Sequence, residues 1–306
     1  MTFVGCSIPE QFVNPLFEVF DGGDFALSSY RDVEAPLAQL RIYMSDPSGA
    51  GEAERRLRAA MDVVGVSSPI DVGELPDEDW RFSYRRHFKT ETVGRRLVVV
   101  PEWELADWRG DGSSPPRETI VMDPGLAFGT GKHETTRACL QFIDAMSEEL
   151  PRGSSFLDMG CGSGILAIAA AKLGFSPVRG FDVDVEAVAV ASENAALNGV
   201  IVSFEHFALG RGRVPPWGEV RYDVVAANIL GPLLIRFADE VSASVGGRLV
   251  VSGILNALYP EVLAAYESRG LHEIARTTLG EWTTGLLATE LPDGIPCVVD
   301  VLKEYK

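Results

Sequence analysis

The sequence predicts an α/β fold in which a large, mostly parallel sheet follows a small α/β domain. Short apolar runs recur near residues 156, 178, 202, 223, 247, 272 and 285. Helix-length segments separate the earlier runs, as parallel crossover connections require. A glycine-rich turn follows one of these runs and opens an Ala-rich helix. The first 75 residues have a different character, with many interrupting Pro and Gly residues.

Residues 1–75 are predicted to form the small N-terminal domain. Residues 38–43 form a predicted strand, and residues 50–64 a predicted helix. The helix has apolar residues at i, i+3 or i+4 spacing, which indicates one buried face: Ala53, Leu57, Ala60, Met61 and Val64.

Residues 76–118 are predicted to be a connector between two domains. It contains a predicted helix over residues 79–88, a strand over residues 97–100 and a polar loop rich in Gly and Pro over residues 107–116.

Residues 119–306 form the predicted larger domain. A glycine-rich loop over residues 122–131 leads into a helix over residues 134–150. The last two predicted strands, residues 271–279 and 282–289, are close enough for a hairpin around Gly280. That pairing gives the sheet an antiparallel end.

The most informative motif is residues 158–164, which read Asp-Met-Gly-Cys-Gly-Ser-Gly. It follows an apolar strand and precedes a helix over residues 165–173. A dinucleotide-binding turn, GxGxxG, would need a glycine at Ile165, so an NAD-binding oxidoreductase is disfavoured. The pattern D-x-G-x-G-x-G resembles motif I of the Rossmann-like methyltransferases, which bind S-adenosylmethionine.

An acid closes the next predicted strand. Asp182 lies 22 residues after Gly160, near the spacing of about 20 residues expected for a carboxylate that binds ribose hydroxyls. Two accepting oxygens suit a vicinal diol. The alternative is a glycine-rich turn with an unrelated surface Asp, but strand, loop, helix, strand and acid in this order favour a nucleoside site.

Composition limits the function classes. The net charge is −17 and the pI is about 4.7, which argues against general nucleic-acid binding and fits a basic partner or simple solubility. The four Cys have no CxxC spacing and the four His are scattered, so neither a metal site nor a disulfide framework is predicted. No apolar run approaches the ~18 residues of a membrane span. We expect a monomeric cytoplasmic protein.

Three further stretches carry a more specific resemblance: residues 123–136, residues 225–232, and residues 251–255 together with 280–282. With motif I, they are similar to the ribosomal protein L11 methyltransferase family across roughly residues 76–290. The similarity is weaker over residues 1–75, where that family carries a ferredoxin-like substrate-recognition domain. The tail over residues 291–306 has the character of an addition.

The resemblance implies an S-adenosylmethionine-dependent enzyme that methylates lysine ε-amines, an N-terminal α-amine, or both, on one large-subunit ribosomal protein. It implies cofactor contacts at Thr136, Gly160, Asp182 and Asn228 and a loop that covers the cofactor; we expect Asn228 also to be the catalytic residue, for the chemical reason given below. With motif I, the expected cofactor-binding residues are Phe128, Gly129, Thr130, Thr136, Asp158, Gly160, Gly162, Gly164, Asp182 and Asn228.

The chemistry agrees with a site at Asn228. Methyl transfer is an in-line displacement, so positioning supplies most of the catalysis. The acceptor must be a neutral amine, and a dry pocket lowers an amine's pKa because burial disfavours the charged form. Asn228 follows a predicted strand and is therefore expected at the carboxyl edge of the sheet, where open α/β sheets bind ligands.

Several residues have a structural alternative. Asn228 would then be a strand-end turn residue, and Thr135 and Thr136 would be helix N-caps. His133 would be a proton acceptor or, as we expect, a capping or packing residue.

Other functions remain open at this point. The target could be another protein lysine, because methyltransferases of the electron-transfer flavoprotein β-subunit share the catalytic domain. A small-molecule methyltransferase is disfavoured, because such enzymes usually cover the cofactor with an extra lid. A non-catalytic module would have lost the glycines or Asp182, and this chain keeps them. A ferredoxin-like N-terminal domain would favour the ribosomal target.

Overall fold

The computed structural model describes residues 2–9, 12–13, 16–17, 20, 25, 27–30, 37–44, 46–74, 89–122, 133–210 and 220–291. The chain divides into two compact units, Met1–His87 and Phe88–Lys306. The boundary falls inside the predicted connector. The helix predicted over residues 79–88 lies outside the described residues.

The first unit contains a four-stranded sheet with the order β2-β3-β1-β4. Each neighbouring pair is antiparallel. The strands are β1 (Thr2–Ile8), β2 (Leu27–Tyr30), β3 (Ala38–Met44) and β4 (Ile70–Glu74).

The helix α2 (Ala50–Val64) connects β3 to β4 after the short 3-10 turn η2 (Pro47–Gly49). It ends at Gly65, whose φ of 75° suits the left-handed C-terminal position of a helix. Ala53 and Leu57 are fully buried against apolar residues of the sheet. The strand and the amphipathic helix predicted in this region are therefore confirmed.

The second unit begins with a three-stranded sheet, β5 (Glu91–Val93), β6 (Leu97–Pro101) and β7 (Glu118–Met122), in that order, with a 3-10 turn η4 (Glu102–Glu104) after β6. β6 confirms the strand predicted over residues 97–100. The outer strand β7 is bound from the side by Asn198, whose amide oxygen accepts from the Val121 N–H at 2.8 Å. The Asn198 amide nitrogen donates to the Val121 carbonyl at 2.6 Å.

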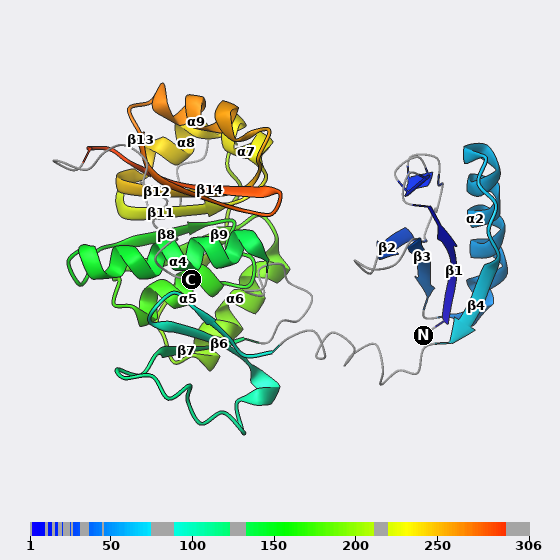
Figure 1. Ribbon diagram of the computed structural model, residues 1–306, viewed down its shortest axis with the longest axis horizontal. Helices are drawn as coiled ribbons and strands as arrows, with labels where there is room; N and C mark the ends of the chain where they lie inside the picture. The colour runs from blue at the N-terminus through cyan, green and yellow to red at the C-terminus, as the bar shows by residue number, and fades with distance from the viewer. Residues whose placement is uncertain are drawn as a thin grey trace. The chain divides into compact units, whose positions relative to one another are not determined.

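The large sheet of the second unit has the order β10-β9-β8-β11-β12-β14-β13. The first five strands are parallel, and β14 is antiparallel to both of its neighbours. All seven strands lie where the sequence predicts them: β8 (Phe156–Met159), β9 (Val178–Asp182), β10 (Ser203–His206), β11 (Tyr222–Asn228), β12 (Val245–Leu255), β13 (His272–Leu279) and β14 (Trp282–Ala288). This is the predicted Rossmann-like sheet with its antiparallel end (Figure 1).

Helices cover both faces of this sheet (Figure 1). One face carries α4 (Glu134–Glu149), α5 (Ile165–Lys172) and α6 (Val185–Leu197), and the other carries α7 (Gly231–Arg236), α8 (Ala238–Ala243) and α9 (Tyr259–Glu267). Among the described helices, none has the length and apolarity needed to cross a membrane.

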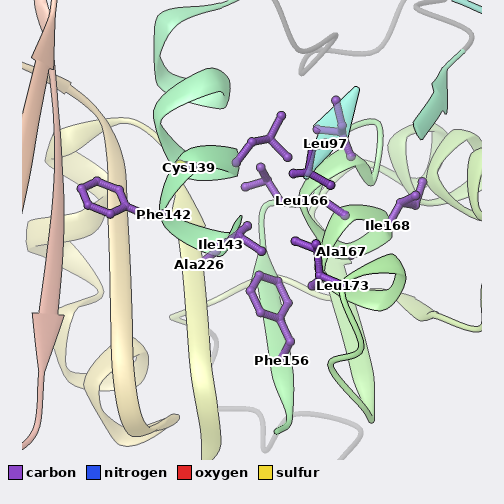
Figure 2. Packing of buried hydrophobic residues seen from close by; sticks show 14 of the residues in the cluster. Leu97, Cys139, Phe142, Ile143, Phe156, Leu166, Ala167, Ile168, Leu173 and Ala226 are labelled. Carbon is purple, nitrogen blue, oxygen red and sulfur yellow. The ribbon is translucent and has the colours of Figure 1, made fainter. Parts of the chain in front are cut away.

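The core on the α4 and α5 face unites both sheets of the second unit. Figure 2 shows part of this core, with side chains from β6, α4, β8, α5 and β11: Leu97, Cys139, Phe142, Ile143, Phe156, Leu166, Ala167, Ile168, Leu173 and Ala226. Each large apolar side chain buried here contributes about 1.5–3 kcal/mol relative to exposure. The strands β8 and β11, whose ends carry the candidate site, are therefore anchored in a packed core.

Candidate active site

The glycine loop connects β8 to α5. Gly160, Gly162 and Gly164 have φ values of 73°, 51° and 81°, a region that side chains with a Cβ rarely adopt. The amides of Gly160 and Cys161 both donate to the Phe181 carbonyl, at 2.9 and 3.0 Å. The loop is therefore bonded to the neighbouring strand β9 before α5 begins.

Asp182 ends β9 beside this loop. One carboxylate oxygen accepts from the Gly162 amide at 2.9 Å, and the other accepts from the Asp184 amide at 3.0 Å. A carboxylate offers about four acceptor positions, so Asp182 can hold the loop and still accept from two ligand hydroxyls.

Asp158 is the buried acid of motif I, with 1% of its surface exposed. One oxygen accepts from the Ala167 amide at 3.2 Å. The other oxygen has no hydrogen-bond partner within the part of the chain that the structure describes. Burial is the main cause of a pKa of about 7 for this carboxyl; the Ala167 hydrogen bond opposes the rise and the charge of Asp182 adds to it. A cationic ligand group at the unpartnered oxygen would stabilise the ionised form.

The N-terminus of α4 distinguishes between the capping residues that the sequence offers. The N-cap is His133, whose Nδ1 accepts from the Thr135 amide at 3.4 Å and lies 2.8 Å from Thr135 Oγ1. The capping role predicted for His133 is confirmed. The N-cap alternative for Thr135 and Thr136 is wrong, because both residues lie inside the helix.

Thr136 and Asp158 contribute two buried oxygens to the same end of the domain. Thr136 is 1% exposed, and its Oγ1 has no partner among the described residues. Asp158 lies near this part of α4, because its negative charge contributes to the raised pKa of the Cys139 thiol. Cys139 lies one turn after Thr136 on α4. A buried polar atom without a partner costs about 1–3 kcal/mol, so this pair suits a polar ligand that completes the missing bonds. The ammonium and carboxylate groups of an amino-acid ligand fit that requirement.

Asn228 is the last residue of β11 and is half-buried. Its register partner on β12 is Ser252. The preceding residue, Ala227, pairs with Met159 at the end of β8. Asn228 and Gly160 thus follow paired residues of adjacent parallel strands, so the sequence-predicted acceptor residue and cofactor loop lie at one sheet edge.

A β-bulge in β12 supports this edge. The register of β12 with β14 shifts between Val251 and Ile254. Inside the bulge, the Ser252 hydroxyl lies 2.6 Å from Thr284 Oγ1 and donates to the Thr135 carbonyl at 3.4 Å. These buried bonds connect β12, β14 and the first turn of α4. Sequence patterns give no sign of the bulge apart from Gly253.

The remaining predicted site residues, Phe128, Gly129 and Thr130, lie outside the described residues. The His133 ring contacts the Trp282 ring edge to face, with centroids 5.2 Å apart. Over the described ranges, no group of His, Cys, Asp and Glu side chains has an arrangement that would hold a metal ion.

Comparisons with known proteins identify the chain's relatives. The family model described as "Ribosomal protein L11 methyltransferase (PrmA)" matches residues 42–289. A ribosomal protein L11 methyltransferase from Geobacter sulfurreducens is 40% identical over 255 residues, which cover 82% of this chain and 76% of that protein. The protein of the same name from Trichlorobacter lovleyi is 34% identical over 298 residues, covering 91% of this chain and 95% of that protein.

A solved structure agrees with these sequence relatives. The crystal structure of a ribosomal protein L11 methylase from Lactobacillus delbrueckii subsp. bulgaricus is 30% identical and has a TM-score of 0.57, covering 65% of this chain and 98% of that one. The range matched by the family model includes the large sheet and the glycine loop described above. The chain therefore belongs to the ribosomal protein L11 methyltransferase family.

Proposed function

We propose that this chain transfers methyl groups from S-adenosylmethionine to lysine ε-amines, an N-terminal α-amine, or both, of ribosomal protein L11. The observation that carries the proposal is the adjacency of two sites on one sheet edge. The glycine loop follows β8, and Asn228 ends the neighbouring strand β11. A methyl donor at the loop and an amine at Asn228 would meet there, in a protein whose family has this activity.

The residues of the donor site fit S-adenosylmethionine. Asp182 would accept from the ribose hydroxyls, and Thr136 and Asp158 would bind the amino-acid end through their unpartnered oxygens. Gly160, Gly162 and Gly164 would let the ligand approach the backbone, and we assign Phe128, Gly129 and Thr130 to the loop over it. The bound cofactor supplies a methyl group on a positively charged sulfur.

The acceptor side depends on Asn228. Its amide oxygen would accept from an amine N–H and hold the nitrogen lone pair in line with the methyl group. Exclusion of water from this edge by the bound substrate would favour the neutral amine over the ammonium. No side chain has to form a covalent bond with the substrate.

We assign substrate recognition to residues 1–75, with residues 76–118 as connector and residues 119–306 as methyltransferase domain. The four-stranded antiparallel order β2-β3-β1-β4, with α2 between β3 and β4, supports a ferredoxin-like recognition domain. That domain favours the ribosomal target over a flavoprotein subunit or a small molecule. The net charge of −17 supports a basic polypeptide substrate without direct nucleic-acid contact. A ribosomal substrate implies the cytoplasm.

The test is intact-mass analysis of purified large-subunit ribosomal proteins after incubation with the enzyme and isotope-labelled S-adenosylmethionine. We expect ribosomal protein L11 to gain labelled methyl groups, and peptide mapping to place them on amines. An incubation without enzyme measures the background. Label on a different protein, or on none, would contradict the assigned substrate.

A further inference from the structure

Ile229 lies between the cofactor loop and the β12 bulge. Its side chain covers Gly160, because a Cβ at position 160 would fall 2.5 Å from Ile229 Cγ2. Its backbone lies against Gly253, because a Cβ at position 253 would fall 2.5 Å from the Ile229 carbonyl oxygen and 2.9 Å from its carbonyl carbon. Both glycines also have positive φ, 73° and 79°. Each of the two glycines thus leaves room for one side of the same isoleucine.

The position of Ile229 in the chain gives these contacts their meaning. It directly follows Asn228, so any movement of the Ile229 backbone also moves the side-chain amide of Asn228, which we propose binds the acceptor amine. Gly160 is the first glycine of the loop that we assign to the cofactor. Ile229 therefore contacts the donor site through its side chain and carries the acceptor site through its backbone.

The support behind Ile229 is rigid on both sides. Gly160 is bonded through its amide to the Phe181 carbonyl at 2.9 Å. Gly253 follows Ser252, whose hydroxyl is held by Thr284 Oγ1 at 2.6 Å. Because neither contact surface can move freely, the width of Ile229 sets the gap between the glycine loop and the end of β11.

We propose that Ile229 is a positioning residue whose γ2 methyl group fixes the separation between the bound methyl donor and the acceptor amine at Asn228. This inference rests on the proposed function in its assignment of the glycine loop to the methyl donor and of Asn228 to the acceptor amine. In-line displacement depends strongly on this separation, and a misplacement of about 1 Å can cost about 100-fold in rate. The γ2 methyl group is the relevant part of the side chain because it is the group that contacts Gly160.

Two substitutions separate this role from simple packing. Ile229→Val is smaller but keeps a branched Cβ and therefore a methyl group at the γ2 position. Ile229→Leu keeps the full side-chain volume but loses that methyl group. If Ile229 only fills space, the leucine variant will be the better enzyme; if the γ2 methyl sets the gap, the valine variant will be.

The experiment measures single-turnover methyl transfer to ribosomal protein L11 at saturating substrate and cofactor, with S-adenosylmethionine affinity from calorimetry. We expect Ile229→Leu to be at least about tenfold slower than Ile229→Val, while the cofactor affinities of the two variants stay within about threefold of each other. Ile235→Leu, the same exchange at a half-buried residue of α7 in the neighbouring core, controls for the exchange itself and should retain the parent rate. A leucine variant as fast as the valine variant would overturn the proposal.

A second measurement does not depend on the protein substrate. An S-adenosylmethionine analogue in which a carbon that carries an amino group replaces the methylated sulfur places a nitrogen where the methyl group would lie, so its binding relative to S-adenosylhomocysteine reports the distance to Asn228. We expect Ile229→Leu to reduce this preference severalfold more than Ile229→Val. If the parent enzyme does not methylate ribosomal protein L11 but this difference persists, the assigned substrate is wrong and the role of Ile229 stands. Equal preferences in the two variants would overturn that role.

Discussion

Asp182 at the end of β9 accepts a hydrogen bond from the Gly162 amide of the neighbouring loop at 2.9 Å, although the two residues are 20 positions apart. Its other oxygen accepts from the Asp184 amide. One carboxylate therefore fixes the glycine loop, fixes the turn into α6 and retains lone pairs for a ligand.

Replacing Asp182 with alanine should weaken S-adenosylmethionine binding by about ten- to a hundredfold, since a hydrogen bond to a charged group contributes roughly 1.5–3 kcal/mol. Calorimetric titration measures the affinity, and a thermal melt checks that the fold is retained. Asp182→Asn keeps one accepting oxygen and should lose less. Unchanged affinity in the alanine variant would remove Asp182 from the cofactor site.

Asn228→Ala should reduce turnover far more than cofactor affinity, because the amide orients the incoming amine. Steady-state kinetics give the loss of kcat, and calorimetry gives the cofactor affinity of the same preparation. An equal loss of both would show that Asn228 contributes mainly to the donor site.

Asn228→Asp should be slow at neutral pH and recover as the pH rises. The variant keeps an accepting oxygen but adds a negative charge, which raises the pKa of the nearby amine and favours the unreactive ammonium. A pH–rate profile under saturating conditions tests this expectation. A variant as fast as the parent at neutral pH would show that Asn228 is a structural turn residue and that another group orients the amine.

Thr136→Val should change folding stability and cofactor binding in opposite directions. The substitution removes a buried hydroxyl that has no partner among the described residues, so the ligand-free protein should gain stability, up to about 1–3 kcal/mol. The same hydroxyl is assigned to the cofactor, whose affinity should fall. Denaturant titration and calorimetry measure the two effects, with Thr136→Ser as the variant that keeps the hydroxyl. Undiminished affinity in the valine variant would place Thr136 outside the site.

Asp158 should make the stability of the cofactor-free protein depend on pH. Its folded-state pKa is raised to about 7 by burial, so the folded state favours the protonated carboxyl. This stabilisation is fully present below the unfolded-state pKa, near 4, and is lost as the pH rises to about 7.

Relative to Asp158→Asn, which stays neutral, the parent should therefore lose up to about 1.4 kcal/mol per pH unit across that window. Denaturant titrations of both proteins at several pH values from about 4.5 to about 8 measure the difference in their free energies of unfolding. Parallel pH profiles would show that the carboxyl is ionised in the folded protein.

The order of elements in the second unit could be predicted because periodicity and glycine punctuation are local signals. The seven strands of the large sheet and the hairpin around Gly280 follow from apolar runs and turn residues. The placement of Asp182 beside the loop could also be predicted, because the carboxyl ends of adjacent parallel strands share one edge.

Contacts between distant segments could not be predicted in the same way. Nothing in the sequence around Ile229 indicates that Gly160 and Gly253, 69 residues before it and 24 after it, would enclose it. The sequence offers three capping candidates for α4, His133, Thr135 and Thr136, and the imidazole of His133 takes that position. A neighbouring aromatic ring, Trp282, packs against that imidazole, and such tertiary packing decides between candidates that local propensity leaves equal.

The paired bonds between Asn198 and Val121 affect how the protein behaves at high concentration. β7 is one of the two outer strands of its sheet, and unpaired N–H and C=O groups on an outer strand can recruit another chain into a continuous sheet. The amide of Asn198 occupies both groups of Val121, near the end of β7. The side chain of Asn198, the C-cap of α6, thus removes the Val121 groups from the positions at which another chain could add to this sheet edge.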